Sequence, residues 1–271
     1  MVLRRSLHRG WWAAVLSLGL IACHAPGAPA SGQSGEAALQ AGQVQRVGSA
    51  ALCQAQLFQG QPPQLPSAQV AGAVLLCRPS MAVLASPLSR TGLWSAEYLT
   101  PERIEQARTL QRDNTFHPDP DLPASARAEL RDYVHTGYDR GHMSPSADQP
   151  TAATQNDSFS LANMAPQAPR LNRGPWEHLE VAVRHYALRS PVYVITGVRF
   201  VGNEVNALHG RVLVPTTYYK LIYDPARQLG AVYEAQNTNA GKPQGMSVGA
   251  FEQLSGIRFN LGNPGLLTLR F

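Results

Sequence analysis

The chain has 271 residues and a formal net charge of +5, from 23 lysines and arginines against 18 aspartates and glutamates. Three of the arginines precede the first acidic residue in a segment that has the composition of a cleaved leader, so the remainder carries only +2. This length leaves room for one catalytic domain once processing segments are removed. The weak positive field does not by itself identify a nucleic-acid partner, so such a function must rest on particular residues.

The first segment, residues 1–22, has a basic start and an apolar run, which is typical of a signal peptide. Leu-Ile-Ala before Cys23 resembles the lipobox of bacterial lipoproteins, so we expect Cys23 to be lipidated and residues 23–48 to form a flexible tether. His24, in place of aspartate, favours the outer membrane, facing the periplasm or the exterior. The alternative is an ordinary cleaved signal with an incidental cysteine, which would leave the protein periplasmic or secreted.

Two cysteines remain, Cys53 and Cys77, and an even number in an exported chain favours a disulfide. Zinc is a poor alternative because neither residue has a neighbouring cysteine or histidine at ligand spacing.

Residues 49–271 are expected to form the folded domain. Helices are predicted at 101–107, capped by Thr100, at Pro175 and onward, and after Ser247. Irregular mixing of helices and strands predicts an α+β fold rather than repeated βαβ units. The apolar runs that predict strands are VAGAVLLC (70–77), MAVLAS (81–86), GLWSAEYLT (92–100), VYVITGVRFV (192–201), RVLVPTTYYKLIYD (211–224) and LGAVYEAQN (229–237).

Some side chains in these elements are expected to be structural. Trp176 is predicted in the core, and the adjacent Tyr218 and Tyr219 half in the core and half on the surface. His178 and His185 lie seven apart on one helix face but lack a third ligand, which argues against zinc.

The central motif is Asp139-Arg140-Gly141-His142. Taken alone, it is equally compatible with a turn in which Asp139 pairs with Arg140 and the histidine is structural. The segments SFSLANMAPQAPRLNRGPWEHLE that follow supply Asn163, then Asn172 and Glu180.

From about Leu93 to Phe259, the order and spacing of these segments resemble the DNA/RNA non-specific endonuclease family of ββα-metal nucleases. The resemblance implies a central antiparallel sheet flanked by helices, with His142 as the general base and Asn172 as the metal ligand. The ion implied is Mg2+, for which Mn2+ can substitute. An imidazole with a pKa near 6.5 suits a base, and a neutral amide suits Mg2+, which keeps several waters.

The resemblance also implies that Glu180 fixes metal-bound water and that Arg184 contacts phosphate, whereas their i,i+4 spacing alone predicts a helix-stabilising ion pair. By the same resemblance Arg112 stabilises the transition state. The remaining motif residues are implied to support the site: Arg140 and Asn163 behind the His142 loop and the scissile phosphate, and Asp139 as a residue that orients the loop.

The function so implied is hydrolysis of DNA and RNA to products with 5'-phosphates, without sequence preference because the contacts are to the backbone. By analogy the protein is expected to form a homodimer. The alternative function is a surface lipoprotein that binds DNA without cutting it. A nuclease toxin with an immunity partner would need a delivery domain, which the sequence does not offer.

Overall fold

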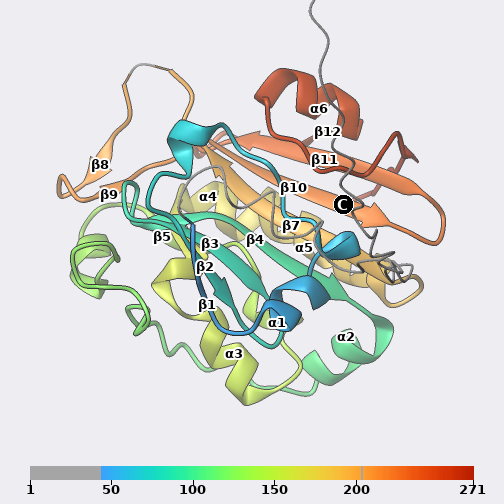
Figure 1. Cartoon of the computed structure of the whole chain (residues 1–271), viewed down its shortest axis with the longest axis horizontal. Coiled ribbons are helices and arrows are strands. Elements are labelled where there is room, and N and C mark those ends of the chain that lie inside the picture. The colour runs from blue at the N-terminus through green and yellow to red at the C-terminus, as the bar shows by residue number, and fades with distance from the viewer. Residues whose placement is uncertain (1–43, 203) are drawn as a thin grey trace, which may run out of the picture. The chain divides into compact units, whose positions relative to one another are not determined.

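The computed structural model describes residues 44–202 and 204–271 (Figure 1). The predicted signal peptide, Cys23 and nearly all of the predicted tether lie outside these residues. Within the described part of the chain, no helix is long and apolar enough to cross a membrane.

A nine-stranded sheet forms the centre of the domain, in the order β1-β2-β3-β4-β7-β10-β11-β12, with β13 also paired to β11. All pairings are antiparallel except β1 with β2 and β11 with β13. The strands are β1 (Gln45–Val47), β2 (Val74–Cys77), β3 (Ala82–Ser86), β4 (Thr91–Leu99), β7 (Val192–Arg199), β10 (Thr217–Asp224), β11 (Leu229–Gln236), β12 (Gln244–Met246) and β13 (Gly265–Leu266). The predicted α+β fold and its antiparallel sheet are confirmed.

Helices and short turns complete the domain. The helices are α1 (Ala50–Ala55), α2 (Pro101–Ala107), α3 (Ala152–Ser158), α4 (Pro169–Leu171), α5 (Glu177–Ala187) and α6 (Val248–Ser255). The 3-10 turns are η1 (Phe58–Gly60), η2 (Ser67–Gln69), η3 (Leu130–Tyr133), η4 (Ser146–Asp148) and η5 (Leu161–Asn163), and a π-helical turn, η6 (Asn172–Trp176), joins α4 to α5. Two small strand pairs lie off the main sheet: β5 (Asp139–His142) with β6 (Met164–Gln167), and β8 (Ala207–Leu208) with β9 (Val212–Leu213).

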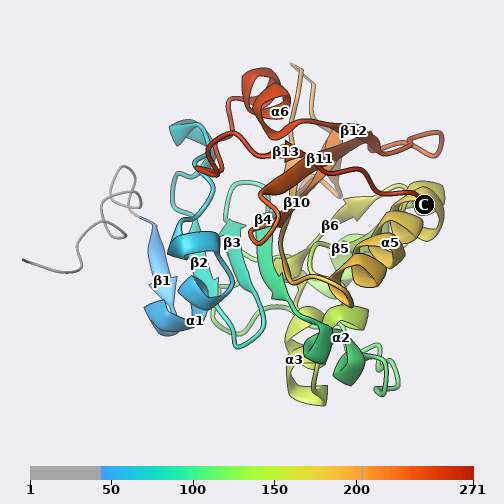
Figure 2. The same cartoon turned by 90° about the vertical axis from the view of Figure 1, so that its right-hand side faces the viewer.

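The sheet is covered on both faces. Helices α5 and α6 lie on opposite sides of it (Figure 2). Leu179 and Val183 of α5 pack with Tyr218 and other residues of β7 and β10, whereas Phe251 of α6 packs with Tyr219 on the opposite face. Every residue of β10 is therefore buried. The expectation that the tyrosine pair is half exposed is wrong, because both alternating faces of this strand are covered, and Trp176 is in the core as predicted.

Of the three helix starts predicted from the sequence, two are confirmed by their capping residues. Thr100 and Ser247 cap α2 and α6 by accepting backbone N–H bonds, as predicted. The helix predicted to start at Pro175 is α5, which begins two residues later, at Glu177. Pro175 lies inside η6 and follows Gly174, whose backbone is not helical (φ −135°, ψ −109°), so the chain is kinked between α4 and α5.

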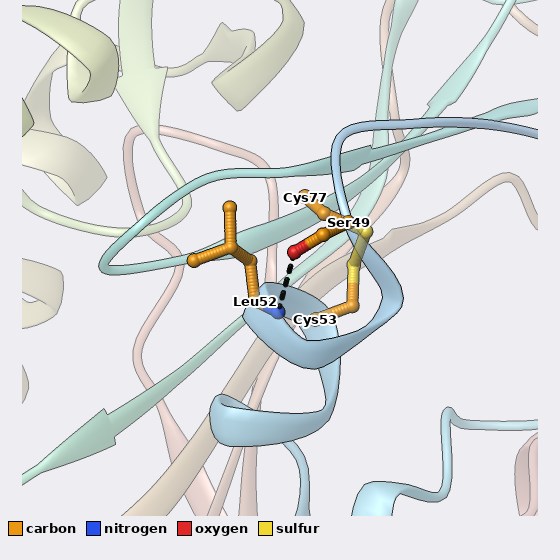
Figure 3. The surroundings of a disulfide bond; sticks show 4 residues. All are labelled: Ser49, Leu52, Cys53 and Cys77. Carbon is orange, nitrogen blue, oxygen red and sulfur yellow. Dashed lines mark hydrogen bonds between the residues drawn. A yellow bond between two sulfur atoms is a disulfide. The ribbon is translucent and has the colours of Figure 1, made fainter.

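The predicted disulfide is present. Cys53 in α1 is bonded to Cys77 at the end of β2, with their Cα atoms 4.8 Å apart, and Ser49 caps α1 beside it (Figure 3). Because β1 is the outermost strand next to β2, the cross-link fastens the first helix to this edge of the sheet.

Candidate active site

The residues of the predicted motif lie on two paired strands and the helical segment that follows them. β5 and β6 pair antiparallel, with His142 opposite Met164, and the chain then continues through α4 and η6 into α5. One open cavity of about 380 Å³ lies against this unit. Its lining includes seven of the predicted site residues: Arg112, Asp139, Arg140, His142, Asn172, Glu180 and Arg184.

His142 ends β5 and is held between aromatic rings. Its ring centroid lies 5.6 Å from that of Phe116 and 5.1 Å from that of Phe159. Its Nε2 is enclosed and has no hydrogen-bond partner among the described residues. Burial, reinforced by the charges of Arg112 and Arg140, lowers the pKa of His142 to about 3. The imidazole is therefore neutral at ordinary pH and able to accept a proton, but its pKa lies well below the value near 6.5 expected from the sequence, so in the free protein His142 is a weaker base than predicted.

Two arginines stack on the same aromatic rings. The guanidinium carbon of Arg140 lies 4.1 Å from the centroid of Phe116, and that of Arg112 lies 5.2 Å from the centroid of Phe159. Arg112 also donates to Ser146 Oγ at 3.1 Å. Such cation–π contacts contribute roughly 0.5–2 kcal/mol each and restrict where the charges lie. The two phenylalanines were not predicted as site residues, since an aromatic in an irregular loop carries no spacing signal.

Asp139 orients the neighbouring polar side chains. Its Oδ2 accepts from Asn172 Nδ2 at 2.9 Å and from Arg173 Nε at 2.8 Å, and its Oδ1 accepts from Arg173 Nη2 at 2.5 Å. The alternative in which Asp139 pairs with Arg140 in a turn is wrong, because the motif forms β5 and Asp139 faces the start of η6. With its amide nitrogen engaged, Asn172 retains its carbonyl oxygen for a ligand.

Glu180 lies one helix turn beyond η6 and its side chain is 14% exposed. Burial raises the pKa of Glu180 to about 7, against the opposing charges of Lys220 and Arg184. Arg184 does not form the ion pair predicted by spacing alone; its Nη1 donates instead to Asp148 Oδ1 at 3.0 Å, at the back of the cavity. Asp148, which is buried, was not predicted as a site residue.

Asn163 supports the loop behind His142 and does not line the cavity. Its Oδ1 accepts from the backbone nitrogen of Ser144 at 3.0 Å, and its Nδ2 donates to the carbonyl oxygens of Ser144 and Ser158, each at 2.9 Å. The Asn163 side chain thus ties the backbone of Ser144, two residues after the histidine, to the backbone of Ser158.

A set of buried charges behind the cavity was missing from the sequence prediction. Glu97 Oε2 in β4 accepts from Arg103 Nη2 at 2.9 Å and from Ser144 Oγ at 2.7 Å. Burial and the nearby carboxylate of Asp148 raise the pKa of Glu97 to about 8, although Arg103 opposes them. Lys220 in β10, also buried, lies near Glu180. The sequence signal for these residues was that Glu97 and Lys220 are charged residues inside otherwise apolar strand segments.

His178 and His185 are both exposed on α5, outside the lining of the cavity. In the described part of the chain, no group of three or more histidine, cysteine, aspartate or glutamate side chains could hold a metal ion. A metal here would therefore be held by few protein ligands.

Two antiparallel strands followed by a helix, with a histidine, an asparagine and a glutamate around one cavity, define the class of ββα-metal nucleases. The family model for DNA/RNA non-specific endonucleases matches residues 64–264. The chain belongs to this family.

Relatives and solved structures agree with this assignment. Nuclease C1 of Cunninghamella echinulata var. echinulata is 37% identical over 149 residues, covering 50% of this chain and 59% of the relative. Human mitochondrial endonuclease G is 36% identical over 130 residues, covering 47% and 43%. The chain thus spans about half the length of these relatives. A crystal structure of an EndoG/EndoGI complex has the same fold, with a TM-score of 0.60, 24% identity, and 68% of this chain and 84% of that chain covered.

Proposed function

We propose that this protein is a Mg2+-dependent endonuclease that hydrolyses phosphodiester bonds in both DNA and RNA. The observation that carries the proposal is the convergence of His142, Asn172 and Glu180 on one cavity with four arginines. A neutral base, an amide oxygen, a carboxylate and several guanidinium groups suit a phosphodiester and a divalent cation bound together. The matched relatives, which are named nucleases, support hydrolysis over the alternative of DNA binding without cleavage.

The residues present fit a hard, largely hydrated ion. Asp139 holds the nitrogen of Asn172, which leaves an amide oxygen as the direct ligand, and Glu180 would hold water bound to the ion. Mg2+ keeps several waters and accepts substrate phosphate oxygens, so one protein ligand is sufficient, and Mn2+ shares this preference for oxygen. When bound, the ion supplies Lewis-acid stabilisation of negative charge on the phosphate and on the departing oxygen.

The protein's own residues supply the proton transfer and the remaining charge. His142, neutral in its aromatic setting, accepts a proton from water as the water oxygen attacks phosphorus. The bond between phosphorus and the 3'-oxygen breaks, giving a 5'-phosphate, and the departing oxygen takes a proton from a second water molecule to become the 3'-hydroxyl. Arg112, Arg140 and Arg184 would stabilise the added negative charge of the transition state. Asp148 holds Arg184 at the back of the cavity for this role.

The same geometry supports action on both nucleic acids. Guanidinium groups and a metal ion act on the phosphate backbone, which carries no base information. The proposed nucleophile is water rather than a ribose hydroxyl, so the reaction does not require RNA.

Lipidation of Cys23, an outer-membrane location and a homodimer are further proposals. Labelled fatty acid should enter the wild-type chain and not Cys23→Ser, and unlabelled wild type would make the protein periplasmic or secreted. Light scattering of the soluble domain would measure its mass, and a monomeric mass across micromolar concentrations would contradict the dimer.

The deciding experiment incubates the protein with supercoiled plasmid and with RNA, in Mg2+ and in EDTA. We expect both substrates to be cut in Mg2+ only, with 5'-phosphates that a phosphatase can remove. Plasmid retained in a gel-shift assay but left uncut in Mg2+ would favour the binding protein instead.

A further inference from the structure

Lys220 is a buried lysine in the centre of the main sheet. It lies in β10, between β7 and β11, and is 1% exposed. Placing an ammonium group in the interior is costly unless other charges and hydrogen bonds compensate. Its Nζ donates to Thr196 Oγ1 of β7 at 2.5 Å and lies 5.6 Å from the ring centroid of Trp176. These contacts fix where the charge stands.

The ammonium group faces the cavity wall from behind. Its Nζ lies 3.9 Å from Glu180 Oε1, while Lys220 itself does not line the cavity. Arg184, the other cation near Glu180, is engaged by Asp148. Among the described residues, Lys220 is the cation at salt-bridge distance from Glu180, and no other carboxylate lies at that distance from Lys220.

The buried acidic and basic side chains behind the cavity lie in pairs. Three carboxylates face three cations in the pairs Glu97–Arg103, Asp148–Arg184 and Glu180–Lys220. Loss of the lysine would leave Glu180 beside the negative charges of Asp148 and Glu177 with less to oppose them. Without the lysine, Glu180 would take up a proton or turn outward toward water, and in either case it would be less able to hold water bound to a cation.

We propose that Lys220 is a positioning residue that holds the Glu180 carboxylate in place behind the divalent cation. The proposal rests on the function proposed above. It assigns a role to a residue outside the motif segments on which the resemblance in the sequence rests. Residues that support a metal site from behind typically change metal affinity 10- to 100-fold when removed. Lys220→Met is therefore expected to weaken binding of Mn2+ about tenfold.

The test is a double-mutant cycle in the full chain with Lys220→Met, Glu180→Gln and both together. Mn2+ alone, without nucleic acid, is titrated by calorimetry, and kcat and KM are measured on a short duplex. We expect kcat to fall and KM to change little in Lys220→Met, because the lysine does not reach the cavity. The double variant should bind Mn2+ no more weakly than Glu180→Gln, since one change acts through the other.

Tyr219→Phe is the matched control, because Tyr219 is the preceding residue of β10, points to the opposite face, and has a buried hydroxyl without a described partner. It should match wild type in Mn2+ affinity and in kcat. If Lys220→Met does not fold, Lys220→Gln, which keeps a donor for Thr196, replaces it in the cycle.

Multiplicative losses of Mn2+ affinity in the double variant, or wild-type affinity in the lysine variant, would overturn the proposal. Wild-type chain that binds Mn2+ but cuts neither DNA nor RNA would refute the proposed function while the calorimetric cycle still decides the role of Lys220. Wild-type chain that does not bind Mn2+ would overturn both.

Discussion

The β5–β6 unit with its following helix and the edge formed by β1, α1 and β2 are attached to the domain by different means. Polar side chains dominate the first, where Asp139, Asn163 and the buried ion pairs orient groups around an open cavity. The second depends on apolar packing and the Cys53–Cys77 bond. Changes in the first region should therefore affect catalysis more than folding, and changes in the second folding more than catalysis.

The largest expected effect is on catalysis. His142→Ala removes the proposed base, and general-base catalysis typically contributes 10²- to 10⁴-fold, so kcat on plasmid should fall by about 10³. The melting temperature should fall only modestly, because the ring's contacts with Phe116 and Phe159 are lost but no hydrogen bond through Nε2 is. A rate within tenfold of wild type in a gel-based time course would refute the assigned role.

The next effect is on stability. Replacing both Cys53 and Cys77 by alanine opens a loop whose closure contributes about 3 kcal/mol, so the free energy of unfolding in urea should fall by that amount. Measured at 20 °C, where the variant remains folded, kcat should equal that of wild type. Loss of kcat in proportion to stability would show that the two regions are not separable.

Asp139→Ala tests whether metal binding in the cavity requires the hydrogen bond that orients the Asn172 side chain. Freed from Asp139, the amide of Asn172 can rotate, and the Mg2+ concentration for half-maximal rate should rise 10- to 100-fold. Arg173→Ala is the control, because it removes the other partner of Asp139 and leaves Asn172 held. Equal effects of the two variants would assign the role to the exposed arginine instead.

A smaller effect is the pH dependence of stability that a residue of the cavity, His142, should confer. The pKa of His142, about 3, is below the ordinary value near 6.5, so the unfolded chain binds its proton more readily. The stability that depends on His142 is fully present above pH 6.5 and is lost as the pH falls toward 3. Between pH 6.5 and 4.5 the loss should be roughly 2 kcal/mol in wild type relative to His142→Asn. If the urea midpoints of wild type and His142→Asn changed equally between pH 6.5 and 4.5, the prediction would be wrong.

The sequence predicted the site most fully where its residues are close together in the chain. His142, Asn172 and Glu180 lie in one unit made of the strands β5 and β6 and the helical segment that follows them. Their spacing along the chain therefore nearly determines that they face one cavity. Cys53 and Cys77 were predictable because few cysteines remained to pair.

Residues whose partners depend on strand order were not predictable. Glu97, Asp148 and Lys220 meet only because β4, β7 and β10 are neighbours and the loop after His142 crosses behind them. The same ordering buried both faces of β10, including Tyr218 and Tyr219. Likewise, Pro175 signals a helix start by local chemistry, whereas α5 begins at Glu177, after a kink at Gly174 that the sequence pattern did not indicate.

The disulfide also determines where a mechanical load would be carried. A pull on the chain ahead of Gln45 reaches the domain through β1, which pairs with β2, and within a few residues meets the covalent link from α1 to the same strand. Force entering from that side is thus borne at the outer edge of the sheet. The inner strands β4, β7 and β10 would carry this force only after the disulfide-linked edge had unfolded.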